Sequence, residues 1–449
     1  MPGTSDKSGG RIRGCPAVVL GVCLSALCGD ISAQYTGIAL YPLTPPGGGA
    51  AGAFVAGGEA VGSYAVPFGD GDVSHALLWK ADGTAVDLNP AGRALSDADA
   101  TDGTQQVGYG TPEITAGFHA LLWSGSPGSV IDLHPAGLSG IDQSVAYGLS
   151  ATQQVGQGYS NLGSPNPIGH ALLWNGSAAS VVDLNPTSLP GITSSLASAT
   201  DGAHEVGWSS PGTQAHHALM WSGSAASAVD LNPGGFATSM AFGVGGNQQV
   251  GMGLTASGGG GALLWTGSAA SAVQLGGDMA VATNGGQQVG SSALRATVWS
   301  GTAASAIDLN NFLPAALRSV QSIATSIDSA GDIFGVAGGY AAEWLPHPVL
   351  PGDANLDGKV DFNDLIALGR HYGQTAGWAQ GDFDQDGKTD FNDLVILARH
   401  YGQTLTGSQL GSLDPAFRTD VQEAFAQMPE PTALPIIALA ALLPLRRRR

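Results

Sequence analysis

Short apolar stretches recur along most of the chain, and each is followed by a second stretch that ends in Asp-Leu or a variant of it. The fullest copies read HALLWKADGTAVDL (75–88), HALLWSGSPGSVIDL (119–133), HALLWNGSAASVVDL (170–184) and HALMWSGSAASAVDL (217–231), with shorter copies at 262–275 and 296–309. Ala/Ser-rich stretches and segments of the type QQVG separate them. An uninterrupted run of four apolar residues is typical of a strand that is covered on both faces. The pattern therefore predicts a β protein built from a repeated unit.

Each unit is expected to contain four short strands. They are the Ala-Leu-Leu-Trp run, the stretch that ends in Asp-Leu, an Ala/Ser-rich stretch such as 96–102, and the QQVG segment. Turns such as Asp102-Gly103 join the last two strands as a hairpin. The tryptophans that mark the units lie 34 to 51 residues apart, a repeat length that indicates a β-propeller or a solenoid.

The number of units favours a mainly β fold with a propeller of seven four-stranded blades. Seven tryptophan strands can be counted, but the chain opens inside a unit at 35–43 and closes with a lone tryptophan strand at 340–346. Pairing of the last strand into the first blade closes the ring and removes exposed sheet edges, which an open solenoid does not require. Six or eight blades, or a β-solenoid, are the alternatives.

Two acidic stretches nearer the C-terminal end are almost copies of each other: DANLDGKVDFND at 353–364 and DFDQDGKTDFND at 382–393. Each twelve-residue loop has oxygen donors at positions 1, 3, 5, 9 and 12, glycine at position 6, and a lysine backbone carbonyl at position 7. This spacing wraps oxygen ligands round a hard cation such as Ca²⁺, without which the carboxylates would repel one another. The alternative is a solvated acidic turn. The expected ligands of two Ca²⁺ ions are Asp353, Asn355, Asp357, Lys359, Asp361 and Asp364 in the first loop, and Asp382, Asp384, Asp386, Lys388, Asp390 and Asp393 in the second.

One helix is expected after each loop, over 362–373 and 391–402, because the leucines and the tyrosine of each stretch fall on a single face. Gly373 and Gly402 are expected to end these helices. No helix is expected before either loop, because the residues that precede the first loop include three prolines at 344–352. Each unit is then a loop followed by one helix, and two such units can pack as a pseudo-twofold module.

The two loop–helix units, over 351–406, resemble a type I dockerin. The resemblance implies a small α-helical calcium-binding module that docks to a cohesin-type domain of another protein. Phe-Asn at loop positions 10 and 11, where many dockerins have Ser or Thr, leaves the identity of that partner open, and core packing is the alternative role of the phenylalanines. The near-identity of the halves suggests that either half can bind the partner. The partner-binding residues carried over from the family are Phe362, Asn363, Arg370, His371, Phe391, Asn392, Arg399 and His400.

The first residues of the chain differ in character from the repeats. Residues 1–33 contain basic residues, then an apolar run and then small residues, which is the layout of a secretory signal peptide; a buried N-terminal strand or helix is the alternative. All three cysteines lie in this segment, so its removal leaves a protein that no disulfide can stabilise. The net charge of −19 argues against a nucleic-acid partner.

The last residues, 429–449, combine Pro429, Glu430 and Pro431 with a short apolar segment and four arginines. They resemble a PEP-CTERM sorting signal. The resemblance implies transient membrane contact through this tail, removal of the tail by an exosortase, and delivery of the protein to the cell surface or the exopolysaccharide matrix. A plain C-terminal anchor is the alternative.

The repeats over 35–345 resemble extracellular HAF-type repeats, which implies export and a β-rich fold but no known chemistry. Histidine recurs at the start of the tryptophan strand in four units (His75, His119, His170 and His217), and aspartate recurs before the final leucine in five (Asp87, Asp132, Asp183, Asp230 and Asp308). Residues that recur in every blade are expected to be structural, and this aspartate is expected to cap a turn. No catalytic residue stands out, so catalysis is not the favoured role of the propeller.

These expectations divide the chain into a signal peptide (1–33), a propeller (34–346), a linker (347–350), a dockerin-like module (351–406), a second linker (407–428) and a sorting signal (429–449). The expected function is that of an exported protein whose module binds calcium and docks to a cohesin-type partner. The propeller is then a binding or scaffold head, with a glycan as its candidate ligand. The alternative is a polysaccharide-active propeller, a glycoside hydrolase or lyase-like enzyme. An isolated pair of unrepeated carboxylates ~5–10 Å apart at one mouth of the ring would favour that alternative.

Overall fold

The computed structural model describes residues 35–45, 53–68, 71–111, 113, 117–160, 168–209, 215–346, 349–402 and 407–426. The predicted signal peptide at 1–33 and the predicted sorting signal at 429–449, with Pro429, Glu430 and Pro431, lie outside the described residues.

The described part of the chain forms seven antiparallel sheets of four strands each. The first three blades contain β2 (Ala53–Ala56), β3 (Glu59–Phe68), β4 (Gly71–Trp79) and β5 (Ala85–Asp87); β6 (Leu95–Thr101), β7 (Gln106–Thr111), β8 (His119–Trp123) and β9 (Ile131–Asp132); and β10 (Gln143–Leu149), β11 (Gln154–Ser160), β12 (Ile168–Trp174) and β13 (Val182–Asp183). The next three contain β14 (Ser195–Thr200), β15 (Glu205–Ser209), β16 (His217–Trp221) and β17 (Val229–Asp230); β18 (Phe236–Gly245), β19 (Gln248–Thr255), β20 (Gly260–Trp265) and β21 (Val273–Gln274); and β22 (Met279–Thr283), β23 (Gln288–Ser292), β24 (Arg295–Trp299) and β25 (Ile307–Asp308). The seventh contains β26 (Ser322–Ile327), β27 (Ile333–Ala337), β28 (Tyr340–Leu345) and β1 (Thr36–Pro42).

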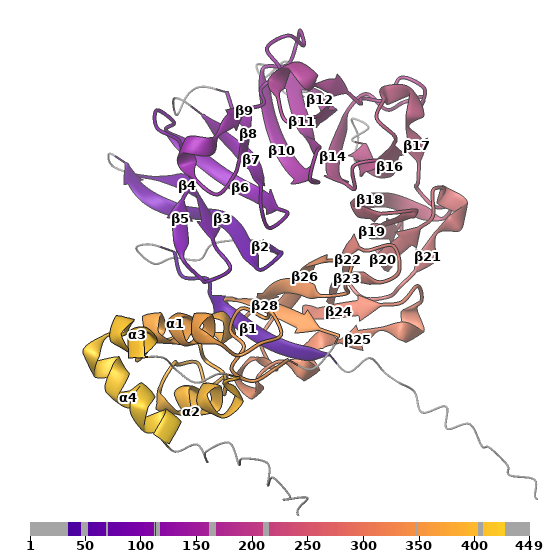
Figure 1. Cartoon of the computed structure of the whole chain (residues 1–449). Helices are drawn as coiled ribbons and strands as arrows, with labels where there is room; N and C mark the ends of the chain where they lie inside the picture. The colour runs from indigo at the N-terminus through magenta and orange to yellow at the C-terminus, as the bar shows by residue number, and fades with distance from the viewer. Residues whose placement is uncertain are drawn as a thin grey trace, which may run out of the picture. The chain divides into compact units, whose positions relative to one another are not determined.

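The sheets follow one another round a ring in chain order, and the first strands of successive sheets contact one another (Figure 1). The last of these contacts, between β26 and β2, returns to the start of the ring. The fold is a seven-bladed β-propeller, as predicted. Its closing blade takes three strands from the C-terminal end of the repeats and its fourth, β1, from the N-terminal end, with Thr36 opposite Leu345 and Pro42 opposite Tyr340.

Short 3-10 turns complete the described part of the ring. Five of them, each three residues long, lie between the third and fourth strands of blades two to six, and two more follow β25. They are η1 (Pro127–Ser129), η2 (Ala178–Ser180), η3 (Ala225–Ser227), η4 (Ala269–Ser271), η5 (Ala303–Ser305), η6 (Leu309–Phe312) and η7 (Ala315–Leu317).

The hydrophobic core of the ring lies between the blades. The tryptophan of each blade packs against the preceding blade: Trp123, for example, contacts a cluster that includes Val61 and Leu78 of the first blade. All seven tryptophans are at most 1% exposed. The apolar run is therefore buried on both faces, because its residues alternate between the two neighbouring blades.

The C-terminal module contains α1 (Phe362–His371), the 3-10 turn η8 (Trp378–Gln380), α2 (Phe391–His400), α3 (Gly407–Ser412) and α4 (Pro415–Ala426). α1 and α2 confirm the two predicted helices. α3 and α4 lie in the segment 407–428 that the sequence suggested as a linker, and α4 buries Phe417, Val421 and Ala424 against the module's core.

The ends of α1 and α2 differ. Gly373 follows α1 with φ +78°, in the left-handed region that favours glycine. Gly402 stands at the same place after α2, as predicted, but it does not have a positive φ. The backbone N–H of Gly402 instead donates to the carbonyl of Val360 at 3.1 Å, which fixes the end of α2 against the first loop.

The closing strand provides a test of the ring. Ile38 lies on β1 and is fully buried, whereas Ile131 at the rim is 43% exposed. We expect Ile38→Ala to lower the free energy of unfolding by about 2–5 kcal/mol, because it leaves a cavity at the closure. Ile131→Ala is the matched control and should change it by less than about 0.5 kcal/mol. Urea unfolding followed by tryptophan fluorescence measures both; equal effects would show that β1 adds little to the closed ring.

Candidate functional site

The two acidic loops have the same internal hydrogen bonds. In the first, Asp353 accepts the backbone N–H groups of Asp357 at 3.2 Å and Gly358 at 2.8 Å. In the second, Asp382 accepts those of Asp386 at 3.1 Å and Gly387 at 2.9 Å. The glycines at position 6 have φ values of +83° and +93°, so this sharp turn needs a residue without a Cβ. The carboxylate at position 1 thus accepts hydrogen bonds from the middle of its own loop and holds that loop in a tight turn.

The residues at positions 9 and 12 begin the helices. Asp361 is the N-cap of α1, and its backbone N–H donates to Asp364 at 2.7 Å, which completes a capping box. Asp390 and Asp393 form the same box at the start of α2, at 2.8 Å. The helix N-terminus therefore fixes the position-12 carboxylate inside the loop.

Three carboxylates converge in the second loop. One oxygen from each of Asp382, Asp384 and Asp393 lies within 4.8 Å of the others; the first and third residues are buried and the second is exposed. Burial raises the pKa of Asp382 to about 7 and that of Asp393 to about 6, and neighbouring aspartates contribute to both shifts. In the first loop the amide Asn355 occupies the place of Asp384. The remaining predicted ligands, Asp357, Lys359, Asp386 and Lys388, are exposed along the same two loops.

The two halves are joined by reciprocal bonds. The N–H of Gly373 donates to the carbonyl of Thr389 at 2.7 Å, and the N–H of Gly402 donates to that of Val360 at 3.1 Å. Each bond runs from the end of one helix to position 8 of the other loop, as the predicted pseudo-twofold arrangement requires. The indole N–H of Trp378 also donates to the carbonyl of Asp353 at 2.6 Å, so the two loops form one unit.

The predicted partner-binding residues lie at both ends of α1 and α2. Five of them are exposed: Asn363, Arg370, Asn392, Arg399 and His400. Phe362, His371 and Phe391 are half-buried, and both phenylalanines pack against the module's core. The structure thus places the phenylalanines at the edge of the core and leaves all of the polar residues except His371 exposed on the surface.

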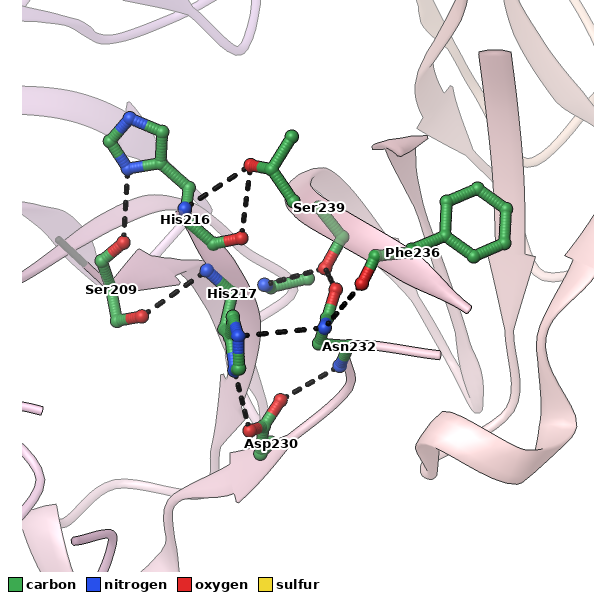
Figure 2. Close-up of polar contacts among 9 residues, drawn as sticks. Ser209, His216, His217, Asp230, Asn232, Phe236 and Ser239 are labelled. Carbon is green, nitrogen blue, oxygen red and sulfur yellow. Dashed lines mark hydrogen bonds and ion pairs between the residues drawn. The ribbon is translucent and has the colours of Figure 1, made fainter. Parts of the chain in front are cut away.

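The recurring histidine and aspartate of the blades form a structural network (Figure 2). In the fourth blade, His217 Nδ1 lies 2.8 Å from Asp230 Oδ2, while Asp230 Oδ1 accepts the backbone N–H of Asn232 at 2.8 Å. The side chain of Asn232 accepts the hydroxyl of Ser239 at 2.7 Å, and that hydroxyl accepts the N–H of Ala218 at 3.0 Å. Because Ser239 belongs to the fifth blade, the network ties two blades together.

The same histidine–aspartate pair recurs in three other blades, and an arginine replaces the histidine in the sixth. The pairs are His75–Asp87, His119–Asp132, His170–Asp183 and Arg295–Asp308. In each, the aspartate also caps the turn that follows it, which confirms the predicted structural role.

Two unrepeated carboxylates on β6 were missed by the sequence analysis. Asp97 and Asp99 belong to the stretch 96–102, which was assigned only as a strand. An alignment of the first strands of the blades would have found them, because the first strands of the other blades have no acidic residue at these positions.

Comparisons with known proteins show no family for this chain. A scan against known protein families finds no match, and a search of curated proteins finds none either. Among solved structures, the chain is similar to the β-propeller domain of the Trilobed protease from Pyrococcus furiosus, with 8% identity over 65% of this chain and 92% of that one and a TM-score of 0.41. A puromycin-hydrolyzing peptidase from Mycobacterium tuberculosis is 13% identical over 68% of this chain and 50% of that one, with a TM-score of 0.39. TolB from Acinetobacter baumannii is 12% identical over 63% of this chain and 79% of that one, with a TM-score of 0.32.

None of the helices in the described residues combines the length and the apolar character needed to cross a bilayer.

The inter-blade network predicts the effect of removing one hydroxyl. Ser239→Ala leaves the N–H of Ala218 and the amide oxygen of Asn232 without their partner in a buried site, so we expect it to cost about 2–4 kcal/mol of unfolding free energy. Ser222→Ala, at an exposed serine, is the control and should have little effect. Equal urea midpoints for the two variants would contradict the structural role of the network.

A buried acid at the ring closure predicts a pH dependence. Glu343 on β28 is 5% exposed, and burial, with smaller contributions from the charges of Asp332 and Asp328, raises its pKa to about 8. Because this pKa lies above the ordinary value of 4.5, the group's contribution to stability is greatest at low pH and is lost as the pH rises from about 4.5 to about 8. The nearby Tyr41, with a raised pKa, stays neutral over this range.

We therefore expect Glu343→Gln to raise the Tm at pH 8 relative to the unmodified protein and to leave it nearly unchanged at pH 5, as measured by scanning calorimetry. Glu423→Gln, on the exposed face of α4, should not alter the pH dependence. An unchanged Tm at pH 8 for Glu343→Gln would show that this carboxyl is not held neutral by the fold.

Proposed function

We propose that residues 351–406 bind two Ca²⁺ ions and dock the protein to a cohesin-type domain, with the propeller as a binding or scaffold head. The observation that carries the proposal is the convergence of the Asp382, Asp384 and Asp393 carboxylates within 4.8 Å in a loop whose turn and helix N-terminus hold them in place. Such a cluster of like charges is costly unless a cation neutralises it.

The donor set fits a hard cation. Carboxylates, one amide and backbone carbonyls are the oxygen ligands that Ca²⁺ prefers, and neither loop contains histidine or cysteine. The position-12 carboxylates already accept backbone N–H groups, but each carboxylate oxygen has a second lone pair that a cation can use. Ca²⁺ would supply charge neutralisation and would link position 1 to the start of the helix.

The exposed side chains on the two helices support a docking role. Asn363 and Arg370 on α1 correspond to Asn392 and Arg399 on α2, and all four are exposed. Because the halves are related by the reciprocal bonds described above, the same polar group is presented twice. We propose that either half engages the partner.

Export and sorting complete the proposal. The layout of residues 1–33 and 429–449 supports secretion, processing by an exosortase, and a final place at the cell surface or in the extracellular matrix.

Calcium binding is tested by calorimetric titration of the full chain with CaCl₂ after treatment with chelator. We expect two ions per chain and a Tm that rises with free calcium, because an ion that binds only the folded state stabilises it. Asp382→Asn should remove about one ion or weaken its binding at least tenfold, and Asp142→Asn, at an exposed acid of the propeller, should change neither. No heat of binding together with an unchanged Tm would refute the calcium site.

Docking is tested with a panel of purified cohesin-type domains in the presence of calcium. We expect Arg370→Ala and Arg399→Ala to reduce affinity only slightly when made singly, because the other half remains, and the double variant to reduce it at least a hundredfold. A single variant that abolishes binding would exclude use of both halves. Binding of calcium without binding of any panel member would refute the docking role and leave the metal site intact.

A further inference from the structure

One position of the blades differs from blade to blade although the backbone around it is the same. Six first strands have a β-bulge after the equivalent alanine, and the extra residue sits where the strand contacts the next blade. Bulges re-aim a side chain and are frequent beside functional sites. In chain order the bulge residues are Asp99, Tyr147, Ser198, Phe242, Val281 and Thr325.

Where this residue is serine or threonine, its hydroxyl binds the next blade. Ser198 Oγ donates to the carbonyl of Ala241 at 2.8 Å. Thr325 Oγ1 donates to the carbonyl of Val55 at 2.8 Å and accepts the N–H of the same residue at 3.1 Å. A serine or threonine hydroxyl at the bulge thus has a structural role, because it joins the first strands of two neighbouring blades.

Asp99 cannot have this role when it is ionised, since a carboxylate has no hydrogen to donate. Its Oδ2 atom is buried and has no hydrogen-bond partner. Asp97, two residues earlier, accepts the hydroxyl of Ser74 at 3.4 Å, and in the described part of the chain neither carboxylate forms an ion pair. Burial and then the charge of Asp97 raise the pKa of Asp99 to about 7. The ionised carboxylate therefore lowers the stability of the folded state. It does not provide the link between blades that serine or threonine provides at this position.

Tyrosines of the second and third blades lie on the strands next to this bulge: Tyr109 pairs with Asp97 across the sheet, and Tyr147 is the bulge residue of the third blade. Tyr109 lies on β7, Tyr147 on β10 and Tyr159 on β11, and all three are half-buried. The hydroxyls of Tyr147 and Tyr159 are 3.3 Å apart, and the ring of Tyr109 packs edge-on against Phe118 with centroids 5.0 Å apart. Burial raises the pKa of both Tyr109 and Tyr147, and the charge of Asp99 adds to both shifts.

We propose that the boundary between the second and third blades binds a primary ammonium group on a slim aliphatic chain, such as a lysine side chain. The ammonium would pair with Asp99, donate to phenol oxygens, and lie beside aromatic faces that attract cations. An ammonium removes the cost of the unpartnered carboxylate, because it brings the positive charge that this part of the blade lacks. This inference does not depend on the proposed calcium site.

The test uses calorimetric titration of the full chain with Nα-acetyl-lysine methylamide. Its neutral isostere, Nα-acetyl-norleucine methylamide, is the matched probe. We expect the lysine probe to bind at least tenfold more tightly at pH 8, and its affinity to fall as the pH drops below about 7, where Asp99 becomes protonated. Equal affinities for the two probes, or no binding of either, would overturn the proposal.

The chain itself offers the decisive variant. Asp99→Ser installs the residue that the fourth blade has at the same position, so we expect the fold to be kept, the Tm to stay equal or rise, and the affinity for the lysine probe to fall at least tenfold. Asp142→Asn removes an exposed charge from the turn before β10 and should leave the affinity unchanged. If Asp99→Ser lowers the Tm, Asp99→Asn, which keeps the side-chain shape, takes its place.

Two further outcomes would overturn the assignment. If Asp99→Ser and Asp99→Asn both bind the lysine probe as tightly as the unmodified protein, the ammonium is bound elsewhere. If a neutral oligosaccharide from a glycan panel binds and either substitution abolishes that binding, while the lysine probe remains inactive, the site recognises sugar hydroxyls and not an ammonium group.

Discussion

The ring depends on how closely the first two strands of each blade approach each other. Opposite the bulge of the first strand, the second strand has a glycine, and a Cβ on Gly156 or Gly251 would lie 1.9 Å from a carbonyl oxygen of its neighbour. No other residue fits without moving the backbone. The recurring Val-Gly pair follows from this constraint: valine fills the space between blades, and glycine lets the bulged strand lie flat against the second strand. The bulge then sets which side chain faces the next blade.

The sequence predicts the blades well because their pattern is local and repeated. Apolar runs, Asp-Gly turns and the odd strand at each end are enough to indicate four-stranded units and a closed ring. The acidic loops are also predictable, since glycine at position 6 and aspartate at position 12 are each fixed by backbone geometry within a few residues. What local pattern cannot provide is tertiary contact. Gly402 is held by Val360 of the other loop, and α4 packs through Phe417 against Tyr372, with ring centroids 5.0 Å apart.

The recurring aspartates of the blades, the carboxylates of the acidic loops and Asp99 lie in three different environments. At the rims of the blades, each recurring aspartate is paired with a histidine or arginine and caps its own turn, so its charge is compensated within the fold. In the loops of the module, carboxylates are brought together by the turn and the helix N-terminus, and in the described residues no ion pair joins them to a basic side chain. Asp99 is half-buried at a blade boundary, and its Oδ2 atom is buried without a hydrogen-bond partner. Compensated acids indicate structure, and the other two environments are where a cation from outside the chain would be expected to act.

The strand that closes the propeller has a consequence for biosynthesis. β1 is the first strand of the ring to leave the ribosome, yet its partner β28 is made about three hundred residues later. The six intermediate blades can fold one after another from contiguous sequence, while the exposed edge of β1 must wait for the end of translation of the repeats. During that interval the nascent protein has an unpaired apolar strand, and a factor that shields this strand until the ring closes would protect the protein from aggregation.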